Sequence, residues 1–230
     1  MNAVIVTNMN DINVFFHIAR MGSFWKEVVE YTCGSIDGSG LHNSARSLNA
    51  VCVGDGDLNY LPIDSRKWTS RYGGGILEYE YPTLQELHEF CKINTKSYVL
   101  YIHTKGVREE RGDRWFRSQW RRFMLHYVVT RWQECVGLLD SGFETVGCLW
   151  KKDPHPHYSG NFWWAKASYI ATLPSPVALS NDQHKRIWAE FWLGRNKPKH
   201  FDFGSPDPSL QAAYWKQIYR DPIEEISCKK

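Results

Sequence analysis

The chain has 230 residues, 43% of them hydrophobic, with 28 basic and 25 acidic residues and a net charge of +3. This length is ordinary for one α/β domain with a single sizeable core, so we expect one domain over residues 1–230. The small net charge argues against a nucleic-acid-binding protein. No apolar stretch approaches the roughly 18 residues that a membrane span needs.

The cysteines show no CxxC spacing, and several lie inside apolar runs. They are residues Cys33, Cys52, Cys91, Cys135, Cys148 and Cys228. A disulfide framework is typical of smaller secreted domains, so reduced and mostly buried thiols are expected here. The N-terminus has neither the basic region nor the long apolar region of a signal peptide, and a cytoplasmic protein is expected.

Short apolar runs alternate with longer helical patterns along the chain, which predicts βα units around a mostly parallel sheet. In chain order, the predicted strands are 2–7 or 12–18 or both, 49–54, 75–81, 97–103, 144–150 and 160–166. The predicted helices are 23–36 with Ser23 as N-cap, 82–94 with Pro82 at its start, 113–139, 167–173, and 182–194 closed by Gly194. Strand 97–103 is the most apolar and is therefore expected to be central.

A polar group follows this central strand directly. The sequence "YIHTKG" delivers His103, Thr104 and Lys105 at the strand end, and Gly106 allows a sharp turn. In open α/β sheets, ligands bind outside the carboxyl ends of the strands. An ammonium matches phosphate oxygens, so Lys105 is a candidate diphosphate ligand.

Arginines crowd the segment after this turn. They are Arg108, Arg111, Arg114, Arg117, Arg121 and Arg122. Some could also bind a diphosphate. The alternative is a solvated basic helix face that is paired with Glu109, Glu110 and Asp113.

The stretch "DPHPHYSGNFWWAK" combines two histidines, a Ser-Gly-Asn turn and two adjacent tryptophans. Gly160 permits close backbone approach to a ligand, and Asn161 offers a donor and an acceptor to hydroxyl groups. Adjacent strand residues point to opposite faces, so one of Trp163 and Trp164 is expected in the core and the other in a cleft. His155 and His157 could be metal ligands, although two histidines are weak evidence for a metal site. The 34 aromatic residues in total fit either a ring-rich core or a cleft with aromatic platforms.

Glu190 lies among aromatic residues in "RIWAEFWLG". A carboxylate in apolar surroundings is costly unless paired, and its pKa tends to rise, which is how a general base is often made. The alternative is a buried ion pair with Arg186 or Arg195.

These motifs together resemble the GT-A class of nucleotide-sugar glycosyltransferases. The strings "YIHTKG" and "HYSGNFWW" are similar to those of a glycosyltransferase-like group found in bacteria, algae and large DNA viruses, in the latter acting in the host cytoplasm. "SGLH", "YEYPTLQEL", "QWRRFM" and "AEFW" extend the likeness over about residues 12–194. The resemblance implies a GT-A-like (Rossmann-like) α/β fold with a central, mostly parallel twisted sheet flanked by helices.

The resemblance also implies roles for individual residues. Glu190 and Lys105 are the expected catalytic pair. Nucleotide-donor binding is expected of Thr7, His103, Thr104, Lys105, Gly106 and Arg114. Sugar or acceptor binding is expected of His157, Ser159, Gly160, Asn161, Trp163 and Trp164.

One departure from the class concerns the metal. Where the class has Asp-x-Asp, which holds Mn²⁺ or Mg²⁺, this chain has His103-Thr104-Lys105. A lysine repels such an ion, so Lys105 is expected to neutralise the leaving diphosphate directly. Asp55 and Asp57 in "GDGD" are weak candidates for a nucleotide or metal contact, because turn chemistry accounts for them equally well.

The function expected from the resemblance is transfer of a sugar from a UDP- or GDP-sugar to a glycan or other hydroxyl acceptor. Two alternatives belong to other classes. One is a glycan- or nucleotide-binding module that has lost catalysis, which the missing Asp-x-Asp favours. The other is a nucleic-acid-binding protein that uses the arginines and aromatics, which predicts steeply salt-dependent binding.

Overall fold

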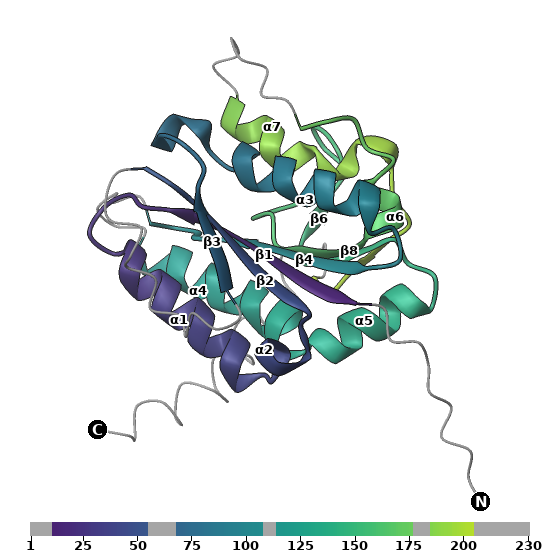
Figure 1. Ribbon diagram of the computed structural model, residues 1–230, viewed down its shortest axis with the longest axis horizontal. Helices are drawn as coiled ribbons and strands as arrows, with labels where there is room; N and C mark the ends of the chain where they lie inside the picture. Colours follow the sequence, from purple (N-terminus) through teal and green to yellow (C-terminus); the bar gives the residue numbers. More distant parts are fainter. Residues whose placement is uncertain (1–10, 55–67, 108–113, 177–184, 205–230) are drawn as a thin grey trace, which may run out of the picture.

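A seven-stranded mixed sheet with helices on both faces forms the centre of the computed structural model (Figure 1). The structure describes residues 11–54, 68–107, 114–176 and 185–204. The strands are β1 (Ile12–Ala19), β2 (Ser47–Val53), β3 (Trp68–Tyr72), β4 (Tyr98–His103), β5 (Thr145–Gly147), β6 (Trp150–Lys151), β7 (His157–Tyr158), β8 (Trp163–Lys166) and β9 (His200–Asp202). The helices are α1 (Trp25–Gly38), α2 (Leu41–Ser44), η1 (Ile76–Glu78), α3 (Tyr81–Ile93), α4 (Arg114–Leu125), η2 (His126–Thr130), α5 (Trp132–Asp140), α6 (Ala167–Ile170), α7 (Lys185–Phe191) and η3 (Leu193–Asn196).

The order of strands in the large sheet is β3-β2-β1-β4-β8-β5-β9. Strands β3, β2, β1 and β4 are parallel, whereas β8 runs antiparallel to both β4 and β5. The prediction of an α/β protein with a mostly parallel sheet is confirmed, as is the central place of β4. From β1 the chain moves outward to β2 and β3, and then returns to β4 on the other side of β1, which makes this point a topological switch.

Alternation along the strands divides the core into two layers. Val14, Phe16 and Ile18 of β1 face one core cluster with α1, η2 and α5, while Phe15 faces the other cluster with α3 and α6. Figure 1 shows α1, α4 and α5 on one side of the sheet and α3, α6 and α7 on the other. His17 points to the α3 side because it follows Phe16 on the strand.

Several sequence predictions about the elements are wrong. Helix α1 begins after Phe24 and not after Ser23. The stretch 75–81 is no strand, because a 3₁₀ turn at Ile76–Glu78 and a left-handed Tyr79 (φ 51°) interrupt it. Strand β3 was not predicted. These features matter because the turn delivers Tyr79 and the next residue to the carboxyl edge of the sheet.

The single helix predicted over 113–139 is also wrong. A π-helical turn at His126–Thr130 separates α4 from α5. Residues 127–129 of this turn are buried. The Nε1 of Trp164 donates to the backbone oxygen of Val128 at 2.6 Å. Further along, α7 ends at Phe191, and Gly194 lies within η3 rather than closing the helix.

The described thiols agree with the prediction of reduced, buried cysteines. Cys33, Cys52, Cys91, Cys135 and Cys148 are all free and buried, and Cys228 lies outside the described residues. In the portion of the chain that the structure describes, no helix has both the length and the apolar character for crossing a membrane.

Candidate functional site

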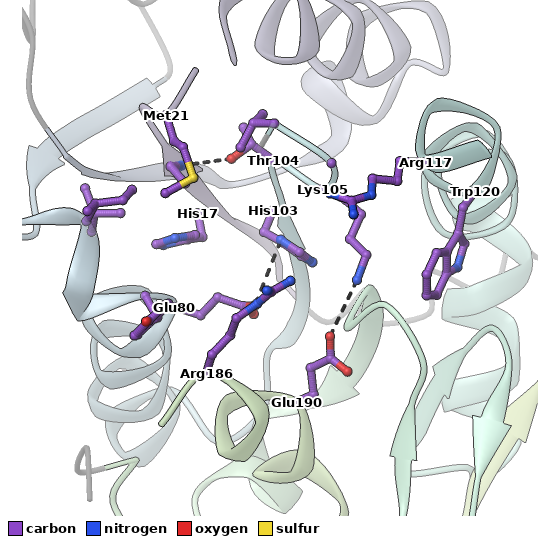
Figure 2. Close-up of a pocket in the computed structure, with 16 residues that line it drawn as sticks. His17, Met21, Glu80, His103, Thr104, Lys105, Arg117, Trp120, Arg186 and Glu190 are labelled. Atoms are coloured by element: carbon purple, nitrogen blue, oxygen red, sulfur yellow. Dashed lines mark hydrogen bonds and ion pairs between the residues drawn. The ribbon is translucent and has the colours of Figure 1, made fainter. Parts of the chain in front are cut away.

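A cavity of about 270 Å³ opens at the carboxyl ends of β1, β2 and β4. It therefore lies at the topological switch between β1 and β4, where ligands bind in open α/β sheets. Its polar lining comes from five separate segments: β1, the residues after η1, the β4 end, α4 and α7 (Figure 2). The charged and polar side chains are His17, Glu80, His103, Thr104, Lys105, Arg117, Arg186 and Glu190.

Two histidines stand side by side at the inner wall of this cavity. His17 of β1 and His103 of β4 are register partners on neighbouring strands. Their exposed fractions are only 2% and 8%. Burial lowers the pKa of His17 to about 4, and burial together with the nearby Lys105 ammonium lowers the pKa of His103 to about 3. Both imidazoles are therefore neutral at physiological pH.

Because His103 is neutral, only one of its two ring nitrogens carries a proton, and its hydrogen bond shows which one. Its Nε2 lies 2.8 Å from the backbone oxygen of Gly160, and a carbonyl oxygen only accepts. Nε2 therefore carries the proton, and Nδ1 has an open lone pair. Nδ1 of His17 is 2.8 Å from Oγ1 of Thr83, which anchors that ring to α3.

Glu80 is the buried carboxylate of the site. Its Oε2 accepts the hydroxyl of Tyr101 at 2.7 Å and the amide Nδ2 of Asn161 at 2.5 Å. Its Oε1 lies 4.0 Å from Nδ1 of His103. Burial, together with the neighbouring Glu80 carboxylate, raises the pKa of the Tyr101 phenol well above its usual range. Glu80 thus joins β4, the Ser-Gly-Asn turn and the start of α3.

The Ser-Gly-Asn turn packs against the cavity wall from behind. Gly160 has a φ of 97°, and a Cβ there would lie 2.6 Å from Sδ of Met124. Asn161 is also left-handed, at φ 57°, and its Oδ1 accepts from Nε1 of Trp163 at 2.8 Å. The turn therefore holds Glu80 and His103 in place, and it does so through its backbone and its amide side chain.

The expectation that one of the paired tryptophans lines a cleft is wrong. Trp163 and Trp164 both have an exposed fraction of 0%. They do point to opposite faces, but each face is covered, Trp163 by the α3 layer and Trp164 by the layer with η2 and α5. The aromatic residues that line the cavity are instead Tyr79 and, on α4, Trp120.

Lys105 and Glu190, 85 residues apart in the sequence, meet across the cavity. Their Nζ and Oε1 atoms are 3.5 Å apart, and the side chains are 13% and 26% exposed (Figure 2). The Lys105 ammonium also lies over the Trp120 ring, 4.5 Å from its centroid. Gly106 has a φ of 82°, and Nη1 of Arg121 donates to the backbone oxygen of Lys105 at 2.7 Å. The hydrogen bond from Arg121 of α4 therefore stabilises the turn that presents Lys105.

The ion-pair alternative for Glu190 named the wrong partner. Glu190 pairs with Lys105, and not with Arg186 or Arg195 as the ion-pair alternative supposed. Arg186 lines the cavity and reaches from α7 toward His103 (Figure 2). Thr104 is structural in part, because its Oγ1 accepts from the backbone N–H of Ala19 at 2.8 Å.

Other predicted site residues lie away from the cavity. His157 is buried, its Nδ1 is 2.7 Å from the backbone oxygen of His155, and its ring packs on Phe191. Ser159 is buried, and its N–H donates to the backbone oxygen of Leu149 at 3.0 Å. Neither His157 nor Ser159 lines the cavity.

The side chains of four predicted residues lie outside the described part of the structure. Thr7, Asp55 and Asp57 lie outside the described residues. Arg114 begins α4, but its side chain is outside the described part. Within the described ranges, no group of three or more His, Cys, Asp and Glu side chains could hold a metal ion.

Sequence reasoning missed Glu80, His17 and Trp120. Glu80 was hidden in a stretch predicted to be a strand, although it lies two residues before Pro82, at which a helix was expected to start. His17 looked like one polar residue in an apolar strand, and its pairing with His103 depends on strand order. Trp120 lies within the single helix predicted over 113–139, where a tryptophan at helical spacing fits a buried helix face.

A protein family matches residues 76–208, which is more than half of the chain, and its description is "Domain of unknown function (DUF8361)". The chain belongs to this family. The matched region contains most of the cavity lining, with Glu80, His103, Lys105 and Glu190, whereas His17 precedes it.

Two further comparisons were made. None of the curated proteins matches the chain. Among solved structures, the crystal structure of Rv0371C from Mycobacterium tuberculosis H37Rv in complex with manganese is similar, with a TM-score of 0.43 and 9% identity. The likeness covers 90% of this chain and 98% of that one.

Proposed function

We propose that this protein transfers a sugar from a nucleoside-diphosphate sugar to a hydroxyl acceptor, and that its sheet is a variant of the GT-A fold. The observation that carries the proposal is the meeting of Lys105 and Glu190, 3.5 Å apart, in a cavity at the topological switch. These residues supply the two groups that the chemistry requires: a cation for the leaving diphosphate and a carboxylate for the acceptor proton. The sequence resemblance supports the same assignment.

The basic side of the cavity stabilises the leaving group. The acceptor oxygen attacks the anomeric carbon, and the bond from that carbon to the diphosphate oxygen breaks, with its electron pair remaining on the diphosphate. Lys105 neutralises this developing charge, and Arg117 and Arg186 line the same cavity. His103 is a weak candidate for phosphate binding, because its imidazole is neutral.

Glu190 is the proposed base. In the unliganded cavity its carboxylate is paired with Lys105. A diphosphate that takes the lysine as its own partner frees the carboxylate to accept the acceptor proton, as an inverting enzyme requires. If the reaction retains configuration, Glu190 instead orients the sugar.

The described residues do not fit the metal of the wider class. Lys105 stands where the second aspartate of Asp-x-Asp is usual, and a divalent ion beside its ammonium would be repelled. The nearest carboxylate, Glu190, already faces that ammonium. The lysine is therefore proposed to take the role of the ion in the leaving-group step.

The Lys105–Glu190 pair also favours one competing function. Two charges that neutralise each other are consistent with a nucleotide- or glycan-binding module that does no chemistry. The two functions differ in turnover: the module binds a nucleotide sugar but neither hydrolyses nor transfers it.

The test is turnover of UDP- and GDP-sugars by the pure protein and by Glu190→Gln, with Glu134→Gln as a matched control on α5. We expect Glu190→Gln to bind donor as the wild type does and to lose at least about a hundredfold in rate, the usual scale for a general base. Normal turnover by Glu190→Gln would remove this residue from the mechanism. Binding without any turnover by the wild type would establish the binding module.

A further inference from the structure

The inner end of the cavity differs in chemistry from the Lys105 side. Two acceptor atoms face each other there, Oε1 of Glu80 and Nδ1 of His103, 4.0 Å apart. Nε2 of His103 already donates to Gly160, so Nδ1 has only a lone pair to offer. Among the described residues, no donor hydrogen-bonds to either atom, whereas Oε2 of Glu80 has two donors. We call Glu80, His17 and His103 the acceptor end.

These two acceptors face the cavity. Glu80 is 9% exposed and His103 is 8% exposed, and neither Oε1 of Glu80 nor Nδ1 of His103 is among the fully buried side-chain atoms that lack a partner. A ligand that displaces water from these atoms must supply donors in its place, because an acceptor that is buried without a donor loses the free energy of its hydration. Both residues line the cavity, so a molecule inside it can reach them (Figure 2). The missing element is a pair of donors that come from the ligand.

The two carboxylates of the cavity, Glu80 and Glu190, share it with cations that already balance their charge. Arg186 reaches toward His103 from α7, and Lys105 lies near enough to depress the pKa of that histidine. An ammonium group on the ligand would meet these two cations. Neutral hydroxyl groups would not be repelled by them. Two adjacent hydroxyl groups also supply two protons, one for each of the two neighbouring acceptors.

We propose that the acceptor end is a binding subsite for a vicinal diol, whose two hydroxyls donate to Oε1 of Glu80 and Nδ1 of His103. His17 lines the third side of the subsite. A phosphate on the same ligand then lies toward Arg186 and Lys105. This subsite deepens the proposed function and rests on it for the identity of the ligand, because a nucleotide sugar offers such diols both on its ribose and on its sugar.

The proposal assigns Glu80 a role that sequence reasoning did not give it. One oxygen of the carboxylate accepts hydrogen bonds from Tyr101 and Asn161, and the other is free to accept a hydrogen bond from the ligand. The subsite also narrows the expected donor-binding role of His103 to hydroxyl binding. The subsite therefore orients a phosphorylated sugar, with its hydroxyls at the acceptor end and its phosphate toward Lys105.

Glu80→Gln is the most informative variant. The Tyr101 hydroxyl and the Asn161 amide both donate to Oε2, so the amide oxygen of glutamine takes that position. Its NH₂ group then faces His103 and the cavity, where it replaces an acceptor by a donor. Glu78→Gln is the matched control, because Glu78 is exposed on the same segment and does not line the cavity.

The experiment measures calorimetric affinities of the wild type and both variants for two pairs of probes. One pair is the tightest-binding of UDP, GDP, CDP and ADP with its 2′,3′-dideoxy counterpart. The other is glucose 1-phosphate with 3-deoxyglucose 1-phosphate, which has no vicinal diol. We expect the wild type to prefer the diol-bearing member of one pair by about ten- to a hundredfold, the range for hydrogen bonds to a charged group. Glu80→Gln should lose this preference, and Glu78→Gln should keep it.

The outcome also identifies the source of the diol. Preference within the nucleotide pair assigns it to ribose, and preference within the sugar phosphate pair assigns it to the sugar. Equal affinity of the wild type for both members of each pair, a preference that survives in Glu80→Gln, or no binding of any probe overturns the subsite. A diol preference in a protein that never transfers sugar leaves the subsite in place and refutes the transferase function.

Discussion

The buried neutral histidines make a sharp prediction about stability and pH. His17 has a pKa of about 4 in the folded protein, against 6.5 when unburied, and the main cause is burial. The unfolded chain therefore binds a proton at this position between pH 6.5 and 4, whereas the folded chain does not. Protonation favours the unfolded state, so stability falls as pH falls through this window.

The magnitude follows from the two pKa values. At about 1.4 kcal/mol for each pH unit between them, His17 alone removes about 3 kcal/mol of stability by pH 4. His103, with a pKa of about 3, adds a loss of the same sign that continues to lower pH. Such a loss is a large part of the stability of an ordinary domain.

The assay is urea unfolding from pH 7 to pH 4 of the wild type, His17→Gln and His155→Gln. His155 is exposed and serves as the matched control. His17→Gln should lose about 3 kcal/mol less than the wild type over the window, even if its stability at pH 7 is lower. The same pH dependence in the wild type and His17→Gln would refute the reasoning, and so would a flattened curve for His155→Gln.

Two further predictions concern packing and binding. Gly194→Ala places a Cβ 1.7 Å from the backbone oxygen of Pro156, and this overlap should lower the free energy of unfolding by about 3 kcal/mol or more. The matched variant Gly137→Ala on α5 meets nothing within 4 Å and should raise the free energy of unfolding by about 0.5–1 kcal/mol. Thermal unfolding compares the two, and a Gly194→Ala protein as stable as the wild type would contradict the packing of η3 on this loop. Lys105→Ala should lower the affinity for a nucleoside diphosphate by about tenfold or more, because a charged hydrogen bond to phosphate is lost. The affinity for the nucleoside should stay unchanged. Calorimetry tests this, and equal loss for both ligands would mean that Lys105 does not touch phosphate.

The sequence predicted the sheet well where local pattern and burial agree. Strands β1, β2 and β4 are apolar runs of ordinary length, and helix α3 begins near Pro82 as expected. The stretch 75–81 misled because its alternating apolar and acidic residues fit a strand, while its left-handed Tyr79 is visible only in the structure. The π-helical turn of η2 leaves the helical spacing of aromatics almost unchanged, so periodicity alone did not reveal it.

The candidate site was predicted in part. The strand-end rule found His103 and Lys105, and the odd placement of a carboxylate among aromatics found Glu190. Their contact depends on how α7 crosses the sheet, which no local pattern encodes. The tryptophans were misassigned because alternation says that they face opposite ways, but not that both faces are covered.

Binding of nucleoside diphosphates in the absence of divalent metal tests the central claim most directly. Thermal unfolding of the pure protein is followed with UDP, GDP, CDP and ADP, each in EDTA and in Mn²⁺. A ligand that binds only the folded state must raise the melting temperature. The account predicts that at least one nucleoside diphosphate does so in EDTA, and that Lys105→Ala abolishes the shift. No shift with any of them, in EDTA or in Mn²⁺, would contradict a nucleotide-sugar site in this cavity.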